Sequence, residues 1–353
     1  MVGELIPYFV ILLISFFLAD YAEKKDSSIF CALVILSLSV FVGLRSEEVG
    51  IDTAQYLYRY SNCVTNGIEP LFALMILVLY PFKSPSFFLF VCALIPYSLI
   101  IARVWKMREI LSFRYAVMVL VTAFLPFSMN LMRQFIAIGF VFYGSIFLFK
   151  RKTVFYLSLV LLGSLFHLTA LFALPLVYLE HFQKERSSWF DETLLSLFTL
   201  FAPFIALGVV GVVWSSGRMA RYLSYLSFAS NIGFTHFFRL VIYAAVGTVY
   251  FGLLKKGLNH SSNSEALVTL FGECFAISEF GVLLRTLGYV FSYVGRIAAQ
   301  FELYSLCFLS IKIDGKYEKQ VAMIRILVAA VLIALYFQEL ISNGNGVIPY
   351  ELM

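Results

Sequence analysis

One charged segment stands out in an otherwise apolar chain. Residues 44–56 carry Arg45, Glu47, Glu48 and Asp52, whereas the whole chain is 61% hydrophobic and only 13% charged. Arginine can bind phosphate or carboxylate through two hydrogen bonds at once, and a carboxylate can accept a proton. These residue types therefore fit a site for a polar, anionic substrate at a membrane surface. The plain alternative is a membrane loop, where charged residues cost little.

A second set of candidates lies in apolar surroundings. Arg133 lies within the otherwise almost wholly apolar stretch Met129–Phe142, where an arginine costs ~2.5–3.5 kcal/mol on insertion scales unless it faces a polar cavity. His167 separates two apolar stretches, Phe155–Phe166 and Leu168–Leu179. An imidazole titrates near neutral pH and can take up a proton or bind phosphate. The alternatives are an ion pair for Arg133 and a hydrogen-bonded packing role for His167.

The elements that must position these residues are membrane helices. A mean hydropathy of +0.90, with repeated apolar runs, predicts an all-α polytopic membrane protein in one domain, residues 1–353. We expect a bundle of about 11–13 membrane segments, since a full span needs ~20 residues. Outer-membrane barrel strands would alternate apolar and polar residues, and these runs do not. Some runs, such as Pro70–Phe82, are short, so we expect broken or re-entrant helices beside a polar cavity.

Basic residues predict the orientation of the bundle. Clusters such as Lys24–Lys25 and Lys150–Arg151–Lys152 belong on the cytoplasmic side under the positive-inside rule. This orientation places both termini outside. It also requires the stretch from Pro70 to Ile101 to cross only once and residues 155–179 to form a hairpin. The outer loops are then residues 45–69, 130–134, the His167 tip, 214–236 and 285–296, of which 45–69 and 214–236 are expected to form part of a site.

Arginine is concentrated on this outer face, and lysine is absent from it. Because arginine binds phosphate in a bidentate manner and lysine acts as a point charge, the distribution predicts an anion-binding surface. The alternative is that loop carboxylates pair with some of these arginines and only fasten the loops. The outer arginines are Arg45, Arg59, Arg133, Arg218, Arg221, Arg285 and Arg296.

Four short motifs follow one another along the chain. The first, Gly43 to Tyr56, has the pattern G-x-R…V-G-x-D-T-x-x-Y, and the second, Asn130 to Ala137, has N-x-x-R-Q-x-x-A. The third, Phe166 to Leu171, reads F-H-x-T-A-L, and the fourth comprises Arg296-Ile297 and the tail Ile348-Pro349-Tyr350. Together they resemble the EpsG-like family of Wzy-type polymerases, which act on O-antigen or exopolysaccharide repeat units. The resemblance covers nearly the whole chain.

The resemblance implies a fold, a location and a reaction. Such proteins are multi-helix bundles of the bacterial inner membrane, GT-C-like in character, with the site on the outer, periplasmic face. They transfer a growing chain from an undecaprenyl-pyrophosphate-like lipid to the sugar of a new lipid-linked unit. The implied partners are the lipid-linked donor and acceptor oligosaccharides, membrane lipid and a chain-length regulator, with no nucleic acid. The motifs require no metal, and no cofactor is expected.

This reaction assigns roles to the candidate residues. The leaving pyrophosphate must be neutralised, and arginines do this most effectively in a low-dielectric pocket. His167, at the expected hairpin tip, is the expected base. Asp52 is the rival candidate, and it is ranked below His167 because an exposed carboxylate is a weak base. The plain roles for Asp52 are a helix cap or an ion pair with Arg45. The residues expected to bind pyrophosphate and substrate are Arg45, Arg133, Arg221, Arg296, Gln134 and Tyr56.

Other functions stay open on the sequence alone. Glu273 and Glu279 lie in an apolar run, where charged side chains are functional by default. They favour a transporter or a flippase for lipid-linked oligosaccharides, which needs charged sites near the bilayer midplane. The one-sided set of arginine, histidine and aspartate favours the polymerase instead. A membrane O-acyltransferase and a structural partner of a synthase complex are the remaining alternatives.

Overall fold

A computed structural model describes residues 2–178, 264–288, 292–312 and 317–353, together with positions 245, 249, 252 and 253. These residues are mainly helical, and no strand is present among them. Arg45 and Leu352 form an isolated bridge. This confirms the predicted all-α membrane fold. The described helices that are long and apolar enough to cross a membrane are α1 (Val2–Lys25), α5 (Pro85–Lys106), α6 (Phe113–Asn130), α7 (Met132–Phe149) and α15 (Glu318–Ser342).

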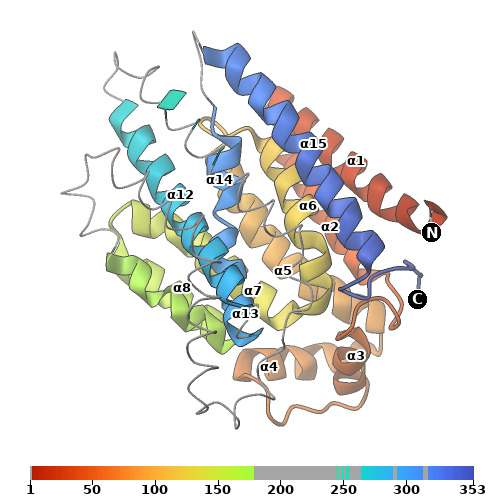
Figure 1. The fold of residues 1–353 in the computed structure, drawn as a ribbon. Coiled ribbons are helices and arrows are strands. Elements are labelled where there is room, and N and C mark those ends of the chain that lie inside the picture. The colour runs from red at the N-terminus through yellow and green to blue at the C-terminus, as the bar shows by residue number, and fades with distance from the viewer. Residues whose placement is uncertain are drawn as a thin grey trace, which may run out of the picture. The chain divides into compact units, whose positions relative to one another are not determined.

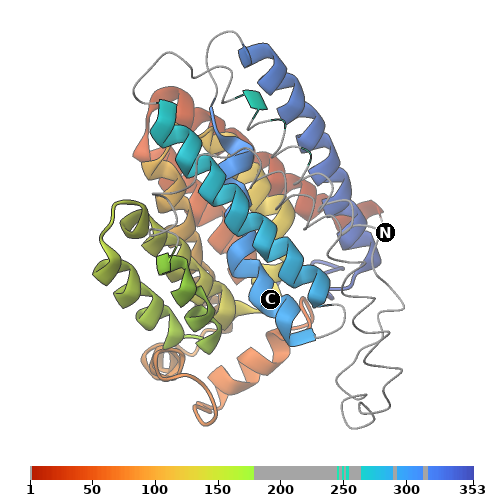
Figure 2. The ribbon, with the colours of Figure 1, turned by 60° about the vertical axis from the view of Figure 1, so that its left-hand side comes forward.

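Several other apolar helices are shorter, as the sequence predicted. α4 (Pro70–Leu79), continued by the 3-10 turn η1 (Tyr80–Phe82), occupies the first predicted short run. α8 (Thr153–Ser164) and the 3-10 helix η2 (Leu168–Tyr178) flank His167 and lie side by side as a hairpin (Figure 2). The Tyr156 hydroxyl of α8 closes this hairpin by donating to the Ala173 carbonyl oxygen at 2.7 Å. The hairpin predicted from residues 155–179 is therefore present.

The chain divides into two compact units, each of which is described by itself. Unit 1 comprises Met1–Val177 and Ala329–Met353, and unit 2 comprises Tyr178–Val328. In unit 2, Gly281 lets two helices approach closely, because a Cβ atom there would lie 2.5 Å from the Glu302 backbone nitrogen. Its described helices are α12 (Ser264–Leu287), α13 (Ser292–Glu302), α14 (Ser305–Ser310) and the first part of α15.

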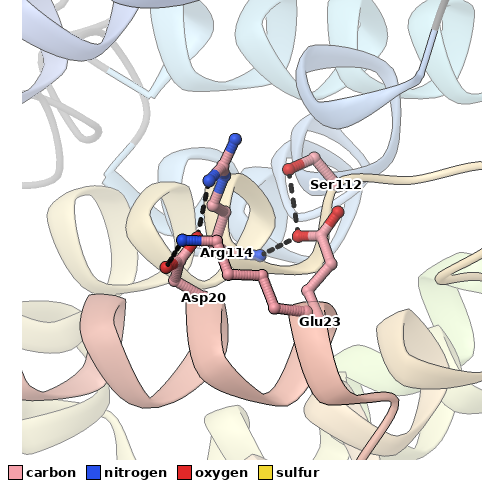
Figure 3. Close-up of polar contacts among 5 residues, drawn as sticks. Asp20, Glu23, Ser112 and Arg114 are labelled. Atoms are coloured by element: carbon pink, nitrogen blue, oxygen red, sulfur yellow. Dashed lines mark hydrogen bonds and ion pairs between the residues drawn. The ribbon is translucent and has the colours of Figure 1, made fainter.

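At one end of unit 1, which we call the basic end, α1 finishes beside the start of α6 (Figure 3). Asp20 accepts hydrogen bonds from Lys24 and Arg114, at 2.7 and 2.5 Å. Glu23 accepts hydrogen bonds from the Ser112 hydroxyl at 3.2 Å and from the Arg114 backbone N–H at 3.1 Å. A carboxylate at this position satisfies a donor in the first turn of α6 and complements the helix dipole.

The helices α5 and α7 also finish at the basic end. Lys106, the last residue of α5, donates to the Tyr143 hydroxyl of α7 at 2.5 Å. The cluster Lys150–Arg151–Lys152 follows the end of α7 directly. The clusters Lys24–Lys25 and Lys150–Arg151–Lys152, which the sequence placed on one side, therefore lie at one end of unit 1.

The opposite end of unit 1, which we call the site end, carries the predicted outer loops. α2 (Ser28–Gly43) and α6 finish there, and α7 begins there. α3 (Thr53–Ser61) and α4 lie across this end (Figure 1), so α5 alone crosses between the two ends in the region from Pro70 to Ile101. One apolar cluster joins α3, α4, α5, the start of α7 and the hairpin tip: Tyr56, Leu57, Tyr60, Phe72, Met75, Ile76, Leu79, Phe88, Leu89, Cys92, Met132, Ile136 and Phe166.

Candidate active site

Arg45 holds together the loop that follows α2. Its side chain is fully buried, and it donates to the carbonyl oxygens of Val49 at 3.2 Å and Met129 at 2.8 Å. It also donates to the Val42 carbonyl and, at 3.3 Å, to the Thr53 hydroxyl. Burial lowers its pKa to about 10, so the guanidinium stays charged at neutral pH. Because its donors point into the protein, the geometry favours a positioning role over the expected contact with pyrophosphate.

The same loop pairs with the C-terminal tail of the chain. The Gly50 N–H donates to the Gly346 carbonyl at 2.7 Å, and the Ser46 N–H donates to the Glu351 carbonyl at 2.8 Å. Gly50 has a φ of +98°, and a Cβ atom at this position would lie 2.8 Å from the Thr53 hydroxyl oxygen. Glycine is therefore needed in the V-G-x-D-T motif for both backbone conformation and space.

Two side chains hold the tail in place. Asn130, at the end of α6, donates through Nδ2 to the Asn345 carbonyl at 2.9 Å. Tyr350 stacks on Phe41 with ring centroids 4.4 Å apart and donates to the Phe41 carbonyl at 2.6 Å. Sequence reasoning did not predict this packing of the tail on the loop. The Pro-Tyr motif near the C-terminus was the available signal, because a tyrosine there needs a partner for its ring and hydroxyl.

Asp52 and Tyr56 are positioned by α3. Asp52 is half-buried, and its carboxylate makes neither a helix-capping hydrogen bond nor an ion pair within the described residues. The expected cap and the expected pair with Arg45 are therefore not present in this part of the chain. Tyr56, one turn later, is buried, and burial raises its pKa, although the nearby Arg133 charge opposes that shift. At neutral pH the Tyr56 phenol is therefore a neutral hydroxyl group.

Arg133 lies in the first turn of α7 and faces the elements that cross the site end. Its guanidinium carbon is 5.9 Å from the centre of the Tyr56 ring and 5.8 Å from that of Phe72. Its Nη1 donates to Glu69 Oε2 at 2.5 Å, which is the ion pair weighed as an alternative. The side chain is 25% exposed, and its Nε has no hydrogen-bond partner within the described residues. Since no side chain caps α7, the positive end of the helix dipole adds to the Arg133 charge.

The hairpin tip reaches the same end of unit 1. The Leu71 N–H, in the first turn of α4, donates to the Leu165 carbonyl at 3.0 Å. Phe166 stacks on Phe140 of α7 with ring centroids 5.6 Å apart. These two contacts place His167 beside the start of α4. This helix begins directly after Glu69, the ion-pair partner of Arg133. His167 is half-buried, and its Nδ1 lies 2.8 Å from the Thr169 hydroxyl oxygen.

The predicted site residues separate into three groups. Arg296 is exposed on α13 and belongs to unit 2. Arg221 and the loop 214–236 lie outside the described residues. No group of three or more His, Cys, Asp or Glu side chains is placed to hold a metal ion within the described ranges. The elements of the site end bring together Arg45, Asp52, Tyr56, Arg133, Gln134 and His167, of which Gln134 is buried on α7.

Comparison with known proteins gives one family. The family model described as the EpsG family matches residues 28–352, which include every site residue named above. The chain belongs to the EpsG family. This is a Wzy-like polymerase family, so membership supports a role like that of a polysaccharide polymerase, with chemistry of the glycosyltransferase kind. No curated protein and no solved structure gives a significant match.

Proposed function

We propose that this EpsG-family protein joins oligosaccharide repeat units carried on an undecaprenyl-pyrophosphate-like lipid. A hydroxyl oxygen of the acceptor unit attacks the anomeric carbon of the growing chain. The bond between that carbon and the pyrophosphate oxygen breaks, and its electron pair stays with the pyrophosphate. A base accepts the hydroxyl proton. Family membership supports the reaction class, and the residues gathered at the site end support the chemistry.

The observation that carries this proposal is Arg133 at the uncapped start of α7. A pyrophosphate beside it would meet a guanidinium group and the positive end of a helix dipole. Glu69 balances the arginine charge when no substrate is bound. Charge stabilisation of this kind is strongest where water is excluded, and the rings of Tyr56 and Phe72 shield one side of the guanidinium.

The charge distribution of unit 1 supports a site outside the cytoplasm. The basic end carries the lysine clusters, and the positive-inside rule assigns such an end to the cytoplasm. The site end, which carries Arg45 and Arg133, is then on the outer face of the inner membrane. Lipid-linked units joined there would need no further transport of the long polymer through this membrane.

The proposal is tested in cells that lack the protein. Gel analysis of their surface polysaccharide should show single-repeat products in place of the ladder, and the wild-type gene should restore the ladder. Arg133→Lys should restore it poorly, because an ammonium group has no bidentate fork. A normal ladder in cells without the protein, under conditions in which no second polymerase is made, would reject the proposal.

A flippase for lipid-linked oligosaccharides is the second candidate. The observation that favours it is the burial of Glu273 and Glu279 on α12, where 9% and 0% of each residue is exposed. The same gel separates the two functions. Loss of a flippase leaves repeat units on the cytoplasmic side, so single-repeat surface products disappear as well. Loss of a polymerase leaves those products on the surface.

A further inference from the structure

The ring of His167 caps the helix that follows it. The backbone N–H of Thr169 donates to His167 Nδ1 at 3.3 Å, and the Thr169 hydroxyl oxygen lies 2.8 Å from the same nitrogen. The hydroxyl can donate or accept, but a backbone N–H can only donate. His167 Nδ1 must therefore present its lone pair to Thr169, and it carries no proton in this arrangement.

This assignment determines where the imidazole proton lies. In a neutral ring one nitrogen donates and the other accepts, so the proton of His167 is on Nε2. Adding a proton to Nδ1 would direct two N–H groups at each other and break the cap on η2. The cap therefore favours the neutral ring. In that form Nδ1 is occupied by Thr169 and Nε2 already holds a proton, so neither nitrogen serves as a base.

We propose that His167 takes part in the reaction as a hydrogen-bond donor and not as the base. This inference rests on the proposed polymerase function. As the bond between the anomeric carbon and the pyrophosphate breaks, Nε2–H donates to the departing pyrophosphate oxygen and keeps its proton. Arg133 neutralises the charge of the same group. His167 is suited to this place because the hairpin tip contacts the start of α4, next to the Arg133–Glu69 pair.

The acceptor hydroxyl still has to lose its proton, and Asp52 takes that role. Its carboxylate is half-buried and makes neither a helix-capping hydrogen bond nor an ion pair within the described residues. A carboxylate is a sufficient base in glycosyl transfer, because the bond to the leaving group breaks ahead of attack by the acceptor. The oxocarbenium-like anomeric carbon that results is reactive enough to need only weak activation of the acceptor hydroxyl. The proton is then released to water. The roles are therefore the reverse of those expected from the sequence, where His167 was the base and Asp52 its rival.

The tautomer can be measured without any assay of activity. The chain has four histidines, so protein labelled with ¹⁵N only at histidine gives few signals in solid-state NMR of bilayer samples. Comparison with His167→Gln assigns the His167 signals. We expect a hydrogen-bearing Nε2 and a bare Nδ1. A hydrogen-bearing Nδ1 with a bare Nε2 would overturn the inference, whether or not the protein proves to be a polymerase.

Two amide substitutions test the role in the reaction. In the His167→Gln variant, the amide nitrogen can occupy the position of Nε2 and donate a hydrogen bond in its place. In the His167→Asn variant, the amide oxygen can replace Nδ1 in the cap, but no donor remains at the position of Nε2. With purified protein and lipid-linked repeats, we expect the glutamine variant to stay within about tenfold of wild type. The asparagine variant should fall by about 100-fold or more, as loss of one such donor does elsewhere.

The alternatives predict different results. If His167 were the base, both amides would be equally inactive, since an amide accepts no proton, and the inference would fail. Full activity of both variants would also overturn it, because the ring would then have no part in the reaction. Thermal unfolding of both His167 variants checks that the hairpin is intact. If Asp52 is the base, Asp52→Asn should lose more activity than His167→Gln. If the wild-type protein forms no polymer, the proposed function fails, and the NMR result still decides the tautomer.

Discussion

Replacing Arg45 by lysine should destabilise this protein, whereas replacing Arg133 by lysine should mainly remove its activity. The two arginines are 88 residues apart and both lie at the site end, but their surroundings differ. Arg45 is fully buried and donates to carbonyl groups, including that of Met129 at 2.8 Å. Arg133 is 25% exposed and pairs with Glu69.

The size of the Arg45 effect follows from its hydrogen bonds. A guanidinium group spans the carbonyl oxygens of Val42, Val49 and Met129, whereas one ammonium group cannot reach all of these acceptors at once. Hydrogen bonds from a charged group contribute roughly 1.5–3 kcal/mol each. Losing about two of them while keeping the charge should cost ~3 kcal/mol. For a large domain this corresponds to a drop in melting temperature of about 5 °C.

The Arg133 pair should contribute much less to stability. A partly exposed ion pair is worth roughly 1 kcal/mol or less, because water screens both charges. Arg133→Lys also keeps the charge beside Glu69, so the melting temperature should change by no more than about 1 °C. Polymer formation should still fall strongly, because the bidentate contact with pyrophosphate is lost.

Both quantities can be measured on the same purified samples. Tryptophan fluorescence during heating in detergent gives the melting temperature, and a polymerisation assay with lipid-linked repeats gives the activity. Arg59→Lys is the matched control, since Arg59 is a half-buried arginine at the end of α3 that donates to the Asn66 carbonyl at 3.0 Å. A wild-type melting temperature for Arg45→Lys would refute the positioning role. An equal drop for Arg133→Lys would refute the distinction between the two.

Three further predictions concern the site end. In a cysteine-free background, Glu48→Cys and Glu351→Cys should react with an impermeant thiol reagent added to the periplasmic side, and Lys152→Cys should not; the reverse pattern would invert the proposed orientation. Gly50→Ala should lower stability by about 1–3 kcal/mol, because alanine is strained at positive φ, and an unchanged melting temperature would contradict that backbone geometry. Tyr350→Phe should keep most of the activity, since the ring still stacks, while Tyr350→Ala should lose it; equal activities would show that the tail does not hold the loop.

Much of the architecture follows from the sequence alone. The apolar runs have to be helices, because only a helix satisfies its backbone hydrogen bonds inside a bilayer. The stretches on either side of His167 are too short to span, so a hairpin with the histidine at its tip is the simplest arrangement, and α8 and η2 form it. The charged residues also predict one end of the bundle. Basic clusters are excluded from the apolar layer and gather on one side of the membrane, and Lys24–Lys25 and Lys150–Arg151–Lys152 do lie at the same end of unit 1.

Roles of individual side chains depended on the tertiary structure. Arginine as a residue type indicates anion binding, but Arg45 donates to the carbonyl of Met129, 84 residues away, and so ties two segments together. The tail residue Tyr350 finds its acceptor in Phe41, 309 residues away. Hydropathy and spacing indicate on which face of its helix, or at which end, a residue lies, because both are properties of that one helix. The partner of a hydrogen bond depends on where distant segments meet, so only the folded chain decides whether a donor is used by the protein or left for a substrate.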